Sequence, residues 1–506
     1  MTRLFGIHVV SLGIVLFHAL VRTPAPLHLR VLASLLCVAA FILWSRYFLS
    51  RDIGRFPFLE YAVTQFYVYW GLSTISASAL DMPAVNESAS AGAVLAACLV
   101  TVAVLLVHPI GRAFGTCAAR LLAGVVPRTT PTLRPLIVVP WLGLAAAVHA
   151  HAFTGIIPPS AYHVVRVFGD YSPLLVAIAL RDLSKGRSSP SFIACTGTLS
   201  LAGLLTGMME AVIQPVLTAM TLCVVLQRRI PWRSIAAGAL LAIVLNPAKH
   251  YYREMAWQSA ESAKGHVATD PLLAANQWWK AFESAWLSDD SDRTANAAAL
   301  ASRLNESSIN AVVLEKTPVA VPFDYGRNWV YIAMAPVPRL LYPDKPNFTR
   351  IYNDRFSLTY GFQTLEATES STAAYPLVAD GYWNFGWPGV IFVACVAGWL
   401  IGVFSGAFRA RSWAVASIAV SSFVDLHATS SMAAQIMGVL QRVGGMVALL
   451  WVVWIVSHST QGEMASLRPQ ASTVTRGRGS SPSLPTSDPW PCSPRPPPRP
   501  APRWRC

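Results

Sequence analysis

The chain has 506 residues, of which 54% are hydrophobic and only 13% are charged. A soluble globular domain carries about 25% charged residues, so this composition excludes an ordinary soluble protein. The formal net charge of +14 does not indicate nucleic-acid binding, because the excess of Lys and Arg lies in short loops between apolar segments and in the C-terminal tail.

The apolar residues are gathered in blocks of about 16–22 residues, the length that an α-helix needs to cross a bilayer core. Arg166 and Asp170 interrupt the block at 163–181, which is therefore the weakest candidate span. If this block does not cross the membrane, the chain has eleven spans, and every segment after it would have the opposite orientation. The pattern predicts an all-α polytopic membrane protein with about 12 transmembrane helices. The candidate spans are 4–21, 29–45, 58–79, 91–110, 135–157, 163–181, 191–208, 211–226, 233–247, 388–406, 412–430 and 435–456.

Four parts follow along the chain. Residues 1–247 hold helices 1–9, 248–387 form one large loop, 388–458 hold helices 10–12, and 459–506 form a tail. Alternate short loops are rich in arginine, whereas the loop around Asp81 has neither Lys nor Arg. Because Lys and Arg are retained in the cytoplasm, we expect both termini to be cytoplasmic and the large loop to lie outside.

The tail and the cysteines point to no further chemistry. Residues 459–506 are rich in Arg, Pro and Ser and cannot bury a core, so we expect a disordered cytoplasmic segment. The eight cysteines are scattered singly, and no Cys/His spacing is typical of a metal site. We therefore predict no disulfide framework, no metal and no other cofactor.

The large loop begins with helical patterns. Leu272, Ala275, Trp279, Phe282 and Trp286 recur at three- and four-residue spacing, which predicts an amphipathic helix over 271–287 with Asp270 and Pro271 at its start. A second, alanine-rich helix is expected over 294–314. The first helix would pack on the membrane bundle, lie on the membrane surface or line a sugar groove.

Aromatic residues, prolines and cations alternate in the second half of the loop, over 323–362. Two segments are the most distinctive, VPRLLYPDKP at 337–346 and ADGYWNFGWPGVIF at 379–392, where Phe385-Gly386 turns a polar stretch into an apolar one. Cations suit a diphosphate and aromatic faces suit sugar rings. The alternative is a plain aromatic surface with ion pairs.

These two segments resemble the bacterial O-antigen polymerases, the Wzy-type oligosaccharide repeat unit polymerases. The family's PR-x-L-x-P-D-K-P-like segment is matched by Pro338 to Pro346, and its Glu-x-Tyr-x-Asn-Phe-Gly segment by Asp380 to Gly386, with Asp in place of Glu. The resemblance implies a GT-C-like organisation in the bacterial inner membrane, with the large loop in the periplasm.

The resemblance also implies the reaction. A glycan would move from undecaprenyl diphosphate to the terminal hydroxyl of another lipid-linked repeat unit, which requires cations for the departing diphosphate and a base or positioning group for the hydroxyl. On this interpretation the catalytic residues are Arg339, Lys345 and Asp380, with Glu366 or Glu369 as alternatives to Asp380. The substrate-binding residues are Arg327, Tyr342, Arg350, Tyr382 and Asn384.

The implied partners are the undecaprenyl-diphosphate-linked glycan and membrane lipid, with a chain-length regulator as a further candidate and no nucleic acid. Polar residues within spans are additional functional candidates because they are costly in lipid; they are Glu210, Asp425 and His427. An O-antigen ligase and a non-enzymatic polysaccharide or lipid transporter are the alternative functions. Transporters usually show internal repeats, and none is found here.

Overall fold

The computed structural model describes most residues between 25 and 466, and 12, 13, 16 and 20 before them. The exceptions are 50–54, 73–85, 128–134, 151–156, 158–164, 184–188, 208, 228–237, 239, 241–243, 246, 250, 254, 256–270, 288–305, 335–336, 338–341, 343–344, 347, 371–373, 410–411 and 424–425. Two compact units are distinguished, Met1–Ser459 and Thr460–Cys506. In the described stretches the regular structure is helical, with no β-strand.

Four of the described helices are long and apolar enough to cross a membrane: α2 (Leu27–Leu49), α5 (Glu87–Val125), α17 (Leu377–Phe408) and α19 (Met432–Ser466, with Met432–Ser457 as its apolar part). Each contains one of the predicted spans, and the all-α membrane class is thereby supported. Further apolar helices are shorter: α6 (Pro135–His149), α9 (Pro190–Leu204), α10 (Met209–Gln227) and α18 (Trp413–Phe423).

The remaining predicted spans differ in their outcome. The span expected over 58–79 is α3 (Phe58–Phe66) continued by the π-helix η2 (Tyr67–Leu72). The span expected over 163–181 is interrupted, since α8 (Ser172–Asp182) begins only after Asp170, which caps the backbone N–H of Ser172 at 2.8 Å. The predicted spans 4–21 and 233–247 lie largely outside the described residues.

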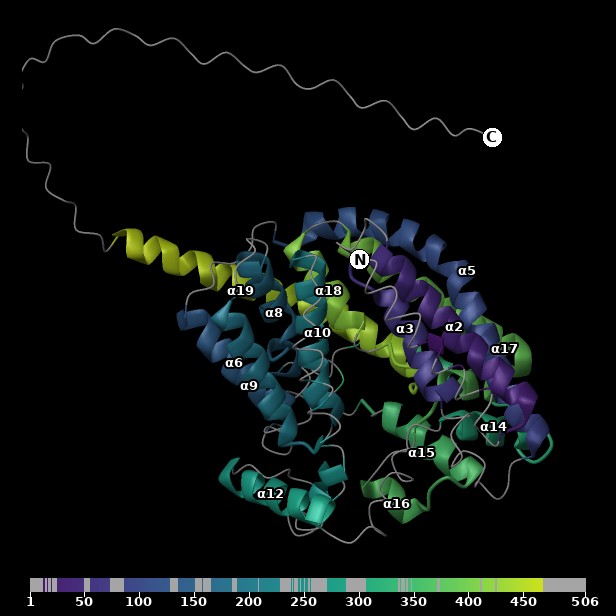
Figure 1. The fold of residues 1–506 in the computed structure, drawn as a ribbon. Helices are drawn as coiled ribbons and strands as arrows, with labels where there is room; N and C mark the ends of the chain where they lie inside the picture. The colour runs from purple at the N-terminus through teal and green to yellow at the C-terminus, as the bar shows by residue number, and fades with distance from the viewer. Residues whose placement is uncertain are drawn as a thin grey trace, which may run out of the picture. The chain divides into compact units, whose positions relative to one another are not determined.

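Glycines bring α5 and α17 into backbone contact, and Figure 1 shows the two helices side by side. A methyl group on Gly111 would overlap the main chain of Trp399, and one on Gly402 would overlap the carbonyl oxygen of His108. Gly398 and Gly406 make equivalent approaches one turn to either side. Small residues at this spacing let helices pack closely in lipid, where no hydrophobic force drives helix association.

A partly buried ion pair joins Asp170, just before the start of α8, to α19, and a hydrogen bond joins Asp170 to α18. Arg442 of α19 lies 3.2 Å from Asp170, whose carboxylate also accepts a hydrogen bond from Ser421 of α18 at 2.5 Å. Since charged groups are costly within a bilayer, each is stabilised here by an opposite or polar partner. A residue that interrupts the predicted span, Asp170, thus holds three helices together.

The large loop contributes helices α12 (Pro271–Leu287), α14 (Glu306–Lys316), α15 (Phe348–Tyr360) and α16 (Leu365–Ser370), and the 3-10 helix η6 (Trp329–Met334). The helix predicted over 271–287 is confirmed at both ends. The one predicted over 294–314 is described from Glu306 and ends two residues later than expected.

We call residues 306–376 the cap. Its core consists of aromatic rings from α15 and the segment before α17, and these rings pack on the first turns of α17 and α19 through Ala379, Trp383, Ala433 and Met437. Phe356 and Tyr375 stack with their ring centres 4.1 Å apart. The cap is therefore built directly onto the ends of two long helices.

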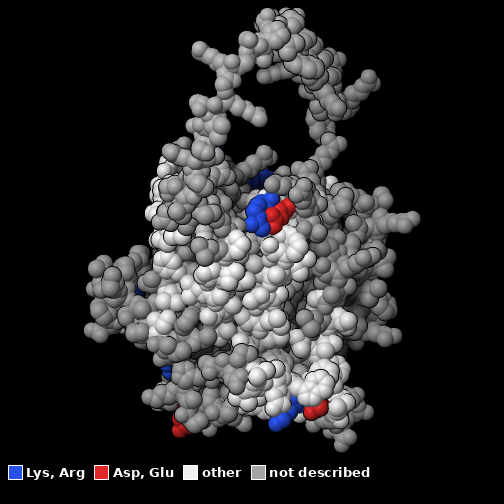
Figure 2. Space-filling view, turned by 90° about the vertical axis from the view of Figure 1, so that its left-hand side faces the viewer, with Lys and Arg blue, Asp and Glu red and all other residues white. Residues whose placement is uncertain are grey.

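Charge is unevenly placed over the described surface. In Figure 2 the larger groups of Lys, Arg, Asp and Glu side chains lie near the top and the bottom, and between them the described surface in the centre of the view is an uncharged band, with small blue patches only near its left edge. Helices α6 and α9, which lie on this side of Figure 1, contain no Asp, Glu, Lys or Arg. An uncharged band between charged levels is what a bilayer core requires.

Candidate functional site

α17 is broken near its start. Phe385 (φ −144°, ψ 21°) and Gly386 (φ 62°, ψ −146°) leave helical geometry, and the second conformation is readily adopted only by glycine. A methyl group on Gly381 or on Gly389 would overlap the main chain of the other, so the two sides of the break are in close contact. The turn expected at Phe385-Gly386 is confirmed, although the helix begins at Leu377 rather than after it.

A turn of the cap completes this break. The backbone N–H groups of Asp324 and Tyr325 donate to the carbonyl oxygens of Trp383 (2.9 Å) and Asn384 (3.2 Å). The N–H of Gly326 donates to the side-chain Oδ1 of Asn384 at 2.8 Å. Tyr325 and Gly326 both have positive φ, which aims these three N–H groups at α17. The carbonyl oxygens of Trp383 and Asn384, which lose their helical hydrogen bonds at the break, thus accept hydrogen bonds from the cap instead.

Asp380 lies at the centre of the site and is fully buried. Its Oδ1 accepts hydrogen bonds from the hydroxyl of Tyr375 (2.9 Å), the amide of Asn384 (2.9 Å) and the indole of Trp329 (3.2 Å). Its Oδ2 accepts from the backbone N–H of Met432 at 2.7 Å. One carboxylate therefore ties together the cap, the first turn of α17 and the first residue of α19.

The bond to Met432 gives α19 its N-terminal cap. The first N–H groups of a helix have no partner within the helix, and its N-terminus carries a partial positive charge. Asp380 supplies an acceptor and a negative charge at this point. Tyr375 remains a donor, because burial and then the neighbouring Asp380 carboxylate raise the pKa of Tyr375 well above its usual range.

A second charged group lies on the same turn. Asp324 is buried and forms an ion pair with Arg355 of α15, whose side chain is 40% exposed. The guanidinium also donates to Oδ1 of Asn328 at 3.3 Å and lies 5.4 Å from the centre of the Trp383 ring. The Asp324–Arg355 ion pair thus holds the turn to α15, while Asn384 holds the turn to α17.

Aromatic rings cover the break on its exposed side. Phe385 contacts Trp329 and Tyr325, with ring centres 5.3 and 6.4 Å apart, and Trp329 stacks on Phe392 at 5.5 Å. Tyr325 is 69% exposed and Phe392 50%. We call Tyr325, Trp329, Phe385 and Phe392 the aromatic surface. Its Trp329 is also the residue that donates to Asp380, so surface and carboxylate are directly connected.

Of the predicted site residues, Asp380 and Asn384 are brought into contact, and Arg327 lies exposed on the turn beside them. Tyr382 is half-buried and contacts the rings of Phe323 and Trp387. Predicted residue Arg339 lies outside the described residues.

Three further predicted residues lie apart from this contact. Lys345 is buried, and its ammonium donates to the carbonyl oxygen of Val337 at 2.9 Å. Arg350 is exposed and pairs with Asp354 at 3.4 Å. Tyr342 is 37% exposed. Their roles towards a substrate stay predictions, and for Lys345 the observed contact is structural.

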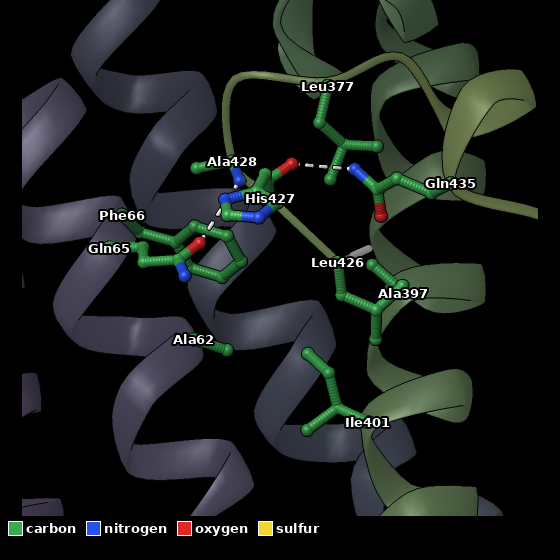
Figure 3. A pocket seen from close by; sticks show the side chains of 10 residues that line it. All are labelled: Ala62, Gln65, Phe66, Leu377, Ala397, Ile401, Leu426, His427, Ala428 and Gln435. Carbon is green, nitrogen blue, oxygen red and sulfur yellow. Dashed lines mark hydrogen bonds between the residues drawn. The ribbon is translucent and has the colours of Figure 1, made fainter. Parts of the chain in front are cut away.

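The alternative acids and the polar residues predicted within spans are only partly described. Glu366 is exposed on α16, whereas the side chains of Glu369, Asp425 and Glu210 lie outside the description. His427 lines a cavity of about 10 Å³, room for about one water molecule. Figure 3 shows this cavity between α3, α17 and the segment before α19, with the backbone N–H of Ala428 bound to Gln65 and the amide of Gln435 bound to the carbonyl of His427.

The sequence does not predict that Trp329 and Tyr375 donate hydrogen bonds to Asp380. It also does not predict that Arg355 binds Asp324 and Asn328 and so holds the turn to α15. The Asp-Tyr-Gly sequence at 324–326 is itself a turn signal. The contact of Trp329 with Asp380 carries no such signal, because a contact between residues 51 positions apart follows only from the fold. Tyr375 is five residues before Asp380, but it lies outside α17, so helix spacing does not predict its contact. In the part of the chain that the structure describes, no group of His, Cys, Asp and Glu is arranged to hold a metal.

The fold and site define an α-helical membrane protein whose cap is fastened to a broken helix by one buried carboxylate. Residues 163–410 match a family model described as "Domain of unknown function (DUF8712)". The match includes the turn, Tyr375, Asp380 and Asn384, and ends before α19. No curated protein and no solved structure matches the chain.

Proposed function

We propose that this protein polymerises undecaprenyl-diphosphate-linked oligosaccharide repeat units into a surface polysaccharide by glycosyl transfer at the periplasmic face. The observation that carries the proposal is the head of α17, where Asp380, Asn384 and the Phe385-Gly386 break lie beneath an exposed turn that bears Arg327. A lipid-linked sugar diphosphate has an apolar tail, a charged middle and a polar glycan. The aromatic surface, the cationic turn and the polar cap offer a counterpart to each part.

In the proposed reaction the bond between the anomeric carbon and the diphosphate oxygen breaks, and the acceptor hydroxyl oxygen forms the new bond to that carbon. The hydroxyl proton passes to the departing diphosphate, which also keeps the bonding electrons. Arg339 and Arg327 would stabilise the departing diphosphate. Asp380 would act as a positioning residue through Trp329, because both of its oxygens are occupied by donors of the protein.

The proposed arrangement includes about 12 transmembrane helices in a GT-C-like organisation in the bacterial inner membrane, with both termini cytoplasmic. The four long apolar helices and the uncharged band support the membrane part of this proposal. A phosphatase fused near residue 300 is expected to be active and one fused near residue 120 inactive. Activity in the opposite pattern would remove the cap from the glycan side and refute the polymerase.

The function is tested by deleting the gene and separating the lipopolysaccharide or capsule on a gel. A single-repeat band is expected. Core lipid without glycan, together with full chains on the lipid carrier, would indicate a ligase instead. Complementation with Arg339→Ala is expected to leave the single-repeat band at normal protein level, because losing one contact to a developing anion costs about 3 kcal/mol, a hundredfold or more in rate.

The turn provides the matched comparison. Arg327→Ala is expected to lower polymer formation while the protein is retained, whereas Lys280→Ala, which removes an exposed cation from α12, is expected to have no effect. Full-length polymer from both Arg327→Ala and Arg339→Ala strains would refute the diphosphate assignment.

A further inference from the structure

Helix α12 presents three different sides. Ala281 and Ala285 are buried, and with Trp278 they pack on the short helical segment that contains Tyr252. The rings of Trp278 and Tyr252 are stacked with centres 4.5 Å apart. The alanine side therefore attaches α12 to the rest of the chain, and this is not the apolar side that the sequence pattern singled out.

Two indole groups fix the helix in place. Trp278 donates to the carbonyl oxygen of Leu204 at 2.9 Å, and Trp286 donates to that of Val244 at 3.0 Å. Leu204 is the last residue of α9, an apolar helix without charged residues. Figure 1 shows α12 below the end of α9. The helix is thus anchored at the end of an apolar helix.

The second side carries the residues predicted to form the apolar face. Leu272 is 82% exposed and Trp279 is 61% exposed. Phe282 stacks on Trp279 with ring centres 6.0 Å apart, and Trp286 follows at 6.3 Å from Phe282. At about 100° per residue these four positions share one side of the helix. We call it the aromatic side of α12. Phe282 and Trp286 are half-buried and also pack against the cluster of Ala281 and Ala285, so Leu272 and Trp279 form the outward part of this side.

The third side carries the polar residues of the helix, together with the exposed Leu273 and Leu287. Asn276, Lys280 and Glu283 are exposed and share the side next to the aromatic one. The helix thus has one side for the protein, one apolar aromatic side and one side for water. In Figure 2 charged side chains appear again at the lower edge of the uncharged band, the level at which α12 lies in Figure 1.

We propose that α12 is an interfacial helix whose aromatic side lies among the lipid headgroups, with the polar side facing water. Trp and Leu on one side and charged residues on the other are typical of helices that lie in the plane of the interface. Indole rings prefer the headgroup level. The anchor at Leu204, the end of an apolar helix, and the lower edge of the uncharged band both place a lipid surface at this helix.

The test compares two exposed positions on one helix. In a background without the eight cysteines, a nitroxide is attached to Trp279→Cys or to Asn276→Cys of the full-length protein. The protein is then placed in vesicles of phosphatidylethanolamine and phosphatidylglycerol. The ratio of collisions with oxygen to collisions with a water-soluble nickel complex is expected to be severalfold higher at 279 than at 276.

Leu272→Cys provides a second probe of the aromatic side if Trp279→Cys does not fold, and the same ratio is expected. Equal, water-like ratios at 272, 279 and 276 in vesicles would overturn the proposal. Spin–spin broadening at 279 together with low access for both reagents would assign this side to a second copy of the chain and would also overturn it. The readout does not involve glycosyl transfer, so it is independent of the proposed function.

Discussion

The two halves of α17 are held by opposite means. From Trp387 onward the helix contacts α5 backbone to backbone through glycines, with few polar groups involved. Before the break, the segment that contains Asp380 and Asn384 is held by hydrogen bonds to the cap and to α19. In lipid, close packing is the available force, whereas a buried polar segment must have each group satisfied. The two halves of α17 thus show that the surroundings of a helix, apolar lipid or a buried polar site, determine which interactions hold it in place.

The glycine contact gives the largest expected effect. Gly402→Ala places a methyl group on the carbonyl of His108, so α5 and α17 must separate along their length, at a cost of about 3 kcal/mol or more. We expect loss of monodisperse protein after extraction from the membrane. Gly197→Ala in α9 is the control, because no atom lies within 4 Å of its added methyl group and alanine favours a helix. An unchanged Gly402→Ala protein would contradict the backbone contact.

The polar half is tested by Asp380→Asn. The amide accepts fewer hydrogen bonds than the carboxylate, and its NH₂ group would face either donors of the cap or the N–H of Met432. A loss of stability of about 3 kcal/mol is expected, measured as a lower midpoint of thermal aggregation in detergent. Glu366→Gln changes an exposed carboxylate of the cap and should leave the midpoint of thermal aggregation nearly unchanged. If the midpoint is unchanged but polymer formation is lost, Asp380 acts on substrate rather than on structure.

Asn384→Ala separates the turn from the carboxylate. It removes the acceptor of Gly326 and the donor to Asp380, and we expect a cost of about 2 kcal/mol. Proteolysis within the turn, followed in membranes, should become faster than in the wild type. Asn276→Ala, which changes an exposed asparagine of α12, serves as the control. Equal proteolysis rates in the two variants would show that the turn is held by its backbone bonds alone.

A pH-dependent effect concerns Glu306, at the start of α14. Burial raises the pKa of this carboxyl from an ordinary value of 4.5 to about 8. The folded state therefore holds a proton that the unfolded chain releases, and the stability this contributes is lost as the pH rises from about 5 to about 8. Glu306→Gln should flatten this fall in the thermal midpoint. A variant whose midpoint follows the wild type over this range would contradict the prediction.

The sequence was informative where one local signal suffices. Hydropathy predicted the long helices, the Asp-Pro start and the aromatic spacing predicted α12 at both ends, and Phe385-Gly386 predicted the break. For α12 the pattern identified the aromatic side but not the packed one, because small alanines carry little hydrophobic signal. The Gly-x₃-Gly spacing at 398, 402 and 406 is typical of a close helix–helix contact, which hydropathy alone does not predict.

The site could be predicted only in part for a related reason. Asp380 and Asn384 are four residues apart on one helix, so their contact follows from helix geometry. Trp329 and Met432 reach the same carboxylate from positions 51 and 52 residues away, and no local pattern encodes that meeting. Tyr375 is only five residues from Asp380 but precedes the helix, so helix geometry does not predict its contact. Lys345 makes a contact that its motif does not predict, since its ammonium donates to the carbonyl oxygen of Val337 in the cap, and its role towards a substrate stays a prediction.

The bond between Asp380 and Met432 has a consequence for biogenesis. The turn at 324–326 is synthesised before the broken helix that it completes, and Asp380 before the helix that it caps. The hydrogen bonds around Asp380 therefore stay incomplete until α19, the last described helix, has been inserted. A chain that stops before residue 432 lacks the backbone N–H that donates to Oδ2 of Asp380. Such a truncated chain is not only shorter but also exposes a buried carboxylate with an unsatisfied oxygen to the proteases that degrade misfolded membrane proteins.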